Sequence, residues 1–291
     1  MKQLNKKMMK VLGFVAIVAA VGVLGTTNSV QAKQLKENKV YKINLDGKKG
    51  KEKVQIKTKQ DKKREDFVIY SMYINGKKVA KQKGFELRCK TMDIDKKSKG
   101  TALVFYAQTD SQCLSNKAGI FSYKDGKLKR LINFNKSFGE MSIYRLDKIS
   151  TNGKGFVTIE ADTPCRVNIG SFFAKIIFQL KSGKLVKVTN GSFVLNKFSR
   201  KYQYVLKENV KVYDNEECTG EEQLIFKKNM KIQILKVSYK ITTVGGRKEV
   251  SAANAYVKAS NGSYGWINIR QVEYDDLDVE HQQFKEYPMW G

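Results

Sequence analysis

Residues 121–128 read Phe-Ser-Tyr-Lys-Asp-Gly-Lys-Leu, and this stretch shows how the chain folds. Short runs with alternating apolar residues flank Asp125-Gly126, and an Asp-Gly pair readily supplies the positive φ angles of a two-residue hairpin. Similar turn signals, Asn75-Gly76, Asn152-Gly153 and Ser182-Gly183, separate other β-branched or aromatic runs. Helical periodicity is almost absent from these runs. The sequence therefore predicts an all-β protein.

The hairpin belongs to a degenerate repeat that extends over residues 39–190. Each unit has an acidic or amide-bearing opening, a connector, a strand and a later hairpin. The openings are Ile43-Asn44-Leu45-Asp46-Gly47, Met92-Asp93-Ile94-Asp95 and Tyr144-Arg145-Leu146-Asp147, and the strands are 54–57, 102–106 and 156–159. A period of roughly 50 residues with about four strands per unit is typical of a propeller blade. Three units are fewer than a complete propeller, so the array is partial, recruits flanking strands, or closes as a sandwich.

The repeats resemble the FG-GAP or VCBS-type repeats of integrin-like β-propellers, whose aspartate loops often bind calcium. Here Asn44 with Asp46, and Asp93 with Asp95, retain two oxygen positions per loop. Lys48 and Lys97 stand where a third oxygen ligand would be, and an ammonium supplies positive charge without an acceptor. We expect metal-free turns in which these lysines pair with the carboxylates, with calcium as the alternative and no other cofactor.

A second module follows, with predicted strands at 204–207, 210–213, 231–237, 255–259 and 264–268. Five short strands in about 70 residues predict a small β-barrel. The Val-Lys-Val-Tyr opening and the closing Tyr264-Gly265-Trp266-Ile267 make residues 202–272 similar to bacterial SH3-like domains, with residues 238–253 as a loop insertion. That resemblance implies binding of wall peptide or glycan. Tyr213, Tyr256, Tyr264 and Trp266 are the candidate ligand-binding residues, and the alternative for Trp266 is a place in the barrel core or rim.

The N-terminus is typical of a cleaved secretory signal peptide. Four lysines precede an uncharged apolar run over residues 11–25, and Val30-Gln31-Ala32 places small residues at a signal-peptidase site. The expected division is a signal peptide (1–32), a basic β-repeat domain (33–200), an SH3-like barrel (201–274) and an acidic, solvated C-terminal tail (275–291). We therefore expect a secreted, extracellular protein, with no membrane span after cleavage.

Charge and cysteine content restrict the partners. Loss of the signal lowers the formal charge from +27 to +23, and lysines concentrate near the start of the mature chain. Such a field favours polyanions, which outside a cell are wall polymers such as peptidoglycan or teichoic-acid-like chains, with nucleic acid less expected. Four cysteines allow three disulfide pairings, which stay open beside free buried thiols. These are Cys89, Cys113, Cys165 and Cys218.

The sequence argues against an enzyme, because the lone His281 lies in an acidic stretch outside both modules. Two hypotheses remain. The first is a non-catalytic secreted binding protein that associates with the cell wall or with anionic surface polymers. The second is an accessory or inhibitory protein that docks on another secreted or surface protein. Salt should weaken the first kind of binding much more than the second.

Overall fold

The computed structural model describes residues 32–109, 114–136, 145–162, 169–188, 191–244, 247–270 and 283–288. The elements that are bounded within these ranges are strands and three 3-10 turns, at Lys96–Ser98, Phe134–Lys136 and Ser199–Lys201, and neighbouring strands pair antiparallel. The all-β prediction is confirmed. None of the described sheets closes into a barrel. No helix in this part of the chain combines the length and the apolar character that a membrane crossing requires.

The repeat region forms three successive antiparallel meanders. The first sheet contains β1 (Val40–Ile43), β2 (Glu52–Gln60), β3 (Val68–Ile74) and β4 (Lys77–Gly84). The second contains β5 (Glu86–Met92), β6 (Ala102–Gln108), β7 (Gly119–Lys124) and β8 (Lys127–Asn133). The third meander comprises β9 (Leu146–Thr151), β10 (Phe156–Asp162), β11 (Phe173–Lys181) and β12 (Lys184–Lys187). The three predicted units thus each correspond to four sequential strands.

The same tight turn closes the last hairpin of each meander. Asp125 and Gly126 have φ angles of 49° and 74°, and positive φ at both central residues makes a turn whose twist matches the flanking strands. Asn75-Gly76 and Ser182-Gly183 adopt the same conformation between β3 and β4 and between β11 and β12. The Asn-Gly, Asp-Gly and Ser-Gly pairs that identified the repeat therefore stand where the backbone requires positive φ angles.

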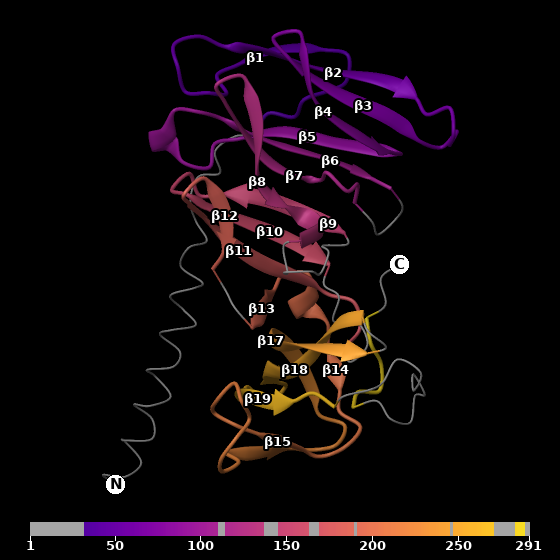
Figure 1. The fold of residues 1–291 in the computed structure, drawn as a ribbon. Coiled ribbons are helices and arrows are strands. Elements are labelled where there is room, and N and C mark those ends of the chain that lie inside the picture. The colour runs from indigo at the N-terminus through magenta and orange to yellow at the C-terminus, as the bar shows by residue number, and fades with distance from the viewer. Residues whose placement is uncertain are drawn as a thin grey trace.

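The meanders stack face to face, and β6 lies between two layers (Figure 1). Leu103 and Phe105 on one face of β6 belong to the core shared with the first sheet. Val104 and Tyr106 on the other face belong to a larger core that continues through the third meander. Because successive side chains of a strand point to opposite faces, burial of both faces requires a sheet on each side.

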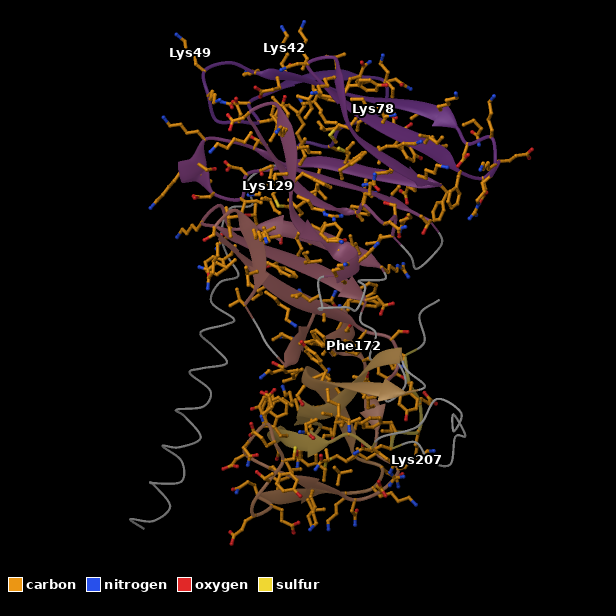
Figure 2. The ribbon with its side chains drawn as sticks, in the orientation of Figure 1. Lys42, Lys49, Lys78, Lys129, Phe172 and Lys207 are labelled. Atoms are coloured by element: carbon orange, nitrogen blue, oxygen red, sulfur yellow. The ribbon has the colours of Figure 1, made fainter. Side chains whose placement is uncertain are left out.

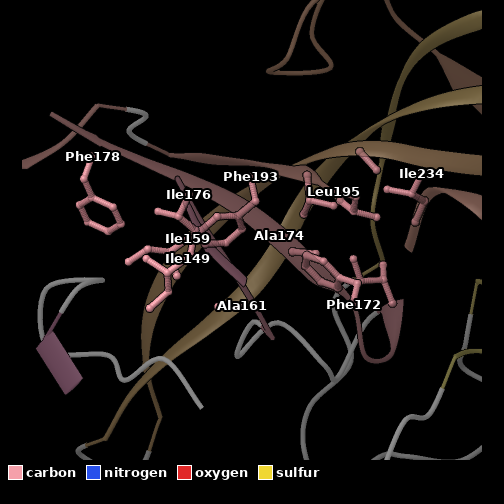
Figure 3. Close-up of a cluster of buried hydrophobic side chains, with 14 of the residues drawn as sticks. Ile149, Ile159, Ala161, Phe172, Ala174, Ile176, Phe178, Phe193, Leu195 and Ile234 are labelled. Carbon is pink, nitrogen blue, oxygen red and sulfur yellow. The ribbon is translucent and has the colours of Figure 1, made fainter. Parts of the chain in front are cut away.

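The larger core extends from the third meander into the C-terminal region. Figure 3 shows part of it, where Ile159 of β10 and Ile176 of β11 lie beside Phe193. The C-terminal strands are β13 (Ser192–Leu195), β14 (Tyr204–Val205), β15 (Val210–Val212), β16 (Leu224–Phe226), β17 (Lys231–Val244), β18 (Arg247–Ala259) and β19 (Tyr264–Asn268). Strand β13 pairs with β11 on one side and β17 on the other, so one sheet crosses the expected boundary at residue 200.

Two features of the C-terminal region differ from expectation. Residues 238–253 were expected to form a loop insertion, but β17 and β18 extend through most of this interval as a long hairpin. The expected solvated tail is also wrong for its described part, because Phe284 is fully buried and forms a β-bridge with Leu206. The Ser171 amide donates to the Pro288 carbonyl at 2.6 Å, which holds the segment against the body. Residues 275–282 and 289–291 lie outside the described ranges.

Burial between the first two sheets predicts a large stability loss on truncation of Phe105. Phe105 is 0% exposed, and Phe105→Ala should lower the free energy of unfolding by about 3–5 kcal/mol, because it leaves a cavity between two layers. Phe85→Ala is the matched control, since Phe85 is 43% exposed and should cost less than about 1 kcal/mol. Urea unfolding of both variants measures the difference. Equal losses would contradict the stacked arrangement.

Candidate functional site

The outer face of the first sheet carries two columns of lysine on either side of a neutral column. Inward side chains of β2 and β3, such as Ile56 and Met72, fill the core, so the alternate residues face solvent. Residues on three strands pair in register across the sheet. The rows are Lys57–Ser71–Lys81 and Lys59–Ile69–Lys83, with Tyr73 opposite Lys78 in the next row.

These rows form a shallow groove of about 590 Å³. Seven lysines and one carboxylate line it, and all seven lysines are exposed. The lining lysines are Lys57, Lys59, Lys62, Lys63, Lys78, Lys81 and Lys83. Figure 2 shows Lys78 over this sheet, with Lys42 and Lys49 at the same end of the molecule and Lys207 near the opposite end. The groove is therefore a concentrated positive surface at one end of the stack.

Asp61 anchors one end of the groove. Its Oδ2 accepts from Lys83 Nζ at 2.8 Å, and its Oδ1 accepts from the Lys63 amide at 3.1 Å. These two hydrogen bonds, with Lys83 as the larger influence, lower the pKa of the Asp61 carboxyl. Among the described residues, Lys83 is the only groove lysine with a carboxylate within ion-pair distance. For the other six groove lysines, the described part of the chain places no carboxylate within ion-pair distance of the ammonium group.

Arg64, in the loop that follows Asp61, is not among the residues that line the groove. Its guanidinium donates to both carboxylate oxygens of Asp66, with the shorter bond at 2.6 Å, and lies 3.6 Å from the centroid of the Phe67 ring. The groove therefore presents ammonium groups and no guanidinium. A lysine ammonium acts as a point charge with three donors, whereas an arginine would impose planar, bidentate geometry.

The predicted metal loops use their oxygens for turns. Asn44 Oδ1 accepts from the Gly47 amide at 2.8 Å, and Asp46 Oδ1 accepts from the Lys48 amide at 2.9 Å. In the second loop Asp95 Oδ1 accepts from the Lys97 amide at 3.0 Å, and Asp93 is half-buried directly after β5. No group of three or more metal-ligating side chains occurs within the described ranges. The loop oxygens of Asn44, Asp46 and Asp95 thus accept hydrogen bonds from main-chain amides of their own turns.

The lysine of the first loop binds a different partner from the one expected. We predicted that Lys48 would pair with the carboxylates of its own loop, but its Nζ lies 3.1 Å from Asp125 Oδ1 in the β7–β8 hairpin. This contact raises the pKa of Lys48, first because its ammonium donates a hydrogen bond to Asp125 and then through the negative charge of that carboxylate. Lys48 thus connects the first sheet with the second.

The structure brings three of the four predicted aromatic residues together on β18 and β19. The Tyr256 ring lies 5.4 Å from that of Trp266 and 6.3 Å from that of Tyr264. Tyr213 is joined to Trp266 by two main-chain hydrogen bonds of 2.8 and 2.9 Å. Trp266 is 4% exposed, with Lys236 Nζ 4.9 Å from its ring centroid. Trp266 is therefore buried, and Tyr264 is the most exposed of the four aromatic residues.

The two cysteines in the described part of the chain are unreactive because they are buried. Cys89 and Cys218 are buried free thiols. Burial raises the pKa of Cys89 far above its usual range and is the main cause that raises the pKa of Cys218 to about 12. Such thiols are not nucleophilic at neutral pH. Cys113, Cys165 and His281 lie outside the described residues.

A scan against protein-family models and searches of curated proteins and of solved structures found no match for this chain. The two family resemblances therefore rest on the sequence motifs alone. The lysine groove was missed at the sequence level, although its signal is present. Lys57 and Lys59 alternate with core residues, as do Lys81 and Lys83, but only strand register places these pairs on the same rows.

Asp61→Asn should destabilise the protein at neutral pH and have little effect in acid. A carboxyl with a lowered native pKa stabilises the fold above its unfolded value of about 3.9, and this stabilisation disappears as pH falls through the lower native value. The difference in urea midpoint between wild type and variant should therefore be constant above about pH 5 and shrink below about pH 4. Asp66→Asn, which removes a more exposed partner, is the control and should have a smaller effect. A difference that persists at pH 2 would contradict this assignment.

Proposed function

We propose that this protein is a non-catalytic, exported binding protein that associates with anionic polymers of the cell wall through the lysine groove on the first sheet. The observation that carries the proposal is the set of six groove lysines that make no ion pair with any carboxylate among the described residues. Clustered like charges raise the free energy of the folded state, and a bound polyanion would relieve that repulsion. The N-terminal signal pattern supports an extracellular setting.

The architecture suits this role. In the proposed arrangement the meanders are the blades of a partial propeller, and the C-terminal strands are a modified SH3-like module that provides a second contact. The proposed second contact centres on Tyr264, which is 47% exposed and has Lys258 Nζ 5.5 Å from its ring centroid. The two proposed contacts lie at opposite ends of the stack (Figures 1 and 2). A protein with this arrangement would hold a wall chain at one end and leave the other end for wall peptide, glycan or a protein.

A charge-removal variant tests the proposal in a wall-sedimentation assay. The variant combines Lys57→Gln, Lys59→Gln, Lys78→Gln and Lys81→Gln, and the walls are used intact and stripped of phosphate polymer. Removing four contacts should weaken binding to intact walls by about tenfold to a hundredfold at low salt. The variant should fold at least as stably as wild type, because like-charge repulsion decreases.

The matched control removes the same charge from the C-terminal region. It combines Lys201→Gln, Lys227→Gln, Lys228→Gln and Lys240→Gln, four exposed lysines outside the groove. This control should retain most of the binding. Equal losses in the two variants would refute the groove as the site. Binding that is unaffected by both variants and by high salt would instead favour docking on another surface protein.

A further inference from the structure

The lysines of the groove are arranged along the direction of strand β3. Strand β3 contributes a neutral floor of Ile69, Ser71 and Tyr73. Lysines of β2 and β4 flank Ile69 and Ser71 on both sides, whereas Tyr73 lies between Gln55 of β2 and Lys78 of β4. The two lysine columns are two strands apart, so their Cα atoms are separated by about 10 Å. Along one column, Lys57 and Lys59 are two residues apart, or about 7 Å. The positive charges therefore form two parallel lines rather than a disc.

The floor is uncharged but not fully apolar. Ser71 has 9% of its surface exposed beneath the neighbouring lysines, and Lys57 Nζ lies 5.0 Å from the centroid of the Tyr73 ring. The span from Ile69 to Tyr73 covers about 14 Å along the strand. One extended chain fits along such a floor with a lysine column on each side. A chain of this length carries about three charges if they are spaced like the lysines.

The chemistry of the flanking groups restricts the anion. The groove presents single ammonium donors, because Arg64 is occupied by Asp66 and Phe67. Separate ammonium groups suit monoanions that are spread along a chain rather than one multiply charged group. A phosphodiester linkage is such a monoanion, and its two non-bridging oxygens project to opposite sides of the chain axis. The two oxygens of one linkage would therefore face both lysine columns, one oxygen toward each column. A pendant carboxylate or sulfate would face only one of the two columns.

We propose that the groove binds a single extended phosphodiester chain that runs along β3, with its linkages between the two lysine columns. This inference rests on the proposed function and adds the ligand class and its direction. It requires the polymer to contact the neutral floor. A diffuse electrostatic attraction would not require that contact, and this difference makes the proposal testable.

The first test uses abasic oligodeoxyribose phosphates with two to ten phosphodiester linkages, labelled for fluorescence anisotropy. Affinity for the full-length protein should rise with each added linkage up to about three, the number of charges that the floor accommodates. Beyond that length it should level off, except for the statistical gain because a longer oligomer can bind in more than one position. The dependence of log K on log salt should stop steepening at the same length, because no further counterions are released. Affinity and salt slope that keep rising to ten linkages would overturn the proposal.

The second test changes the floor without changing charge. Ser71→Tyr fills the middle of the groove and should weaken binding of the four-linkage oligomer at least tenfold. Ile69→Tyr places a larger side chain on the floor at a less buried position. It replaces Ser71→Tyr in this test if that variant does not fold. Ser122→Tyr, on β7 of the second sheet, is the matched control and should leave affinity within twofold.

The outcomes separate the two proposals. Loss of binding in both the floor variants and the lysine variant supports the groove mode. If only the lysine variant loses binding, the proposal of a phosphodiester chain along β3 is overturned and the proposed wall-binding function stands. Unchanged wall binding in the lysine variant would overturn the function and this inference with it.

Discussion

Burial of β6 on both faces is the constraint on which the rest of the structure depends. Leu103 and Phe105 contribute to one core and Val104 and Tyr106 to the other, so no solvent-facing residue interrupts the strand from 102 to 107. A strand of this kind is stable only between two layers. The first and third meanders provide those layers, and the repeat region consequently becomes a stack.

Stacking also determines which surface remains available. The second sheet is covered on both sides, and the apolar face of the third meander joins the core that continues into the C-terminal strands. The first sheet is the end of the stack, with one face on the second sheet and one in water. On that free face β2 and β4 place lysines in register with the neutral residues of β3. Seven lysines are thus grouped on the one face of the first sheet that remains in water.

The loops that resemble metal sites have a structural role in this stack. The Thr101 amide donates to the Asn44 carbonyl at 3.1 Å, and the Gly155 amide donates to the Ile94 carbonyl at 2.8 Å. The loops between the first two strands of consecutive meanders are therefore hydrogen-bonded to one another. Asn44, Asp46 and Asp95 stabilise the turns that make these contacts possible. The side chains that suggested cation binding thus shape the turns whose main-chain groups join one layer to the next.

The sequence by itself determined the β class, one strand in each repeat unit and the tight turns that close the last hairpin of each meander. Alternating side chains and Asn-Gly, Asp-Gly or Ser-Gly pairs act locally, because positive φ angles and strand periodicity depend on neighbouring residues. The C-terminal region was predicted less well. The hairpin of β17 and β18 contains polar residues that gave no clear strand pattern, and the buried Phe284 lies in a stretch that resembles a solvated tail.

Only the tertiary structure decided how these elements combine. The pairing of β13 with both β11 and β17, the partner of Lys48, and the parallel columns of lysine all join residues that are far apart in the chain. The number of lysines gives the net charge of the protein but not where on the surface that charge lies. Strand register and layer order convert that charge into a groove, because they determine which alternate residues face water and which residues of neighbouring strands lie side by side.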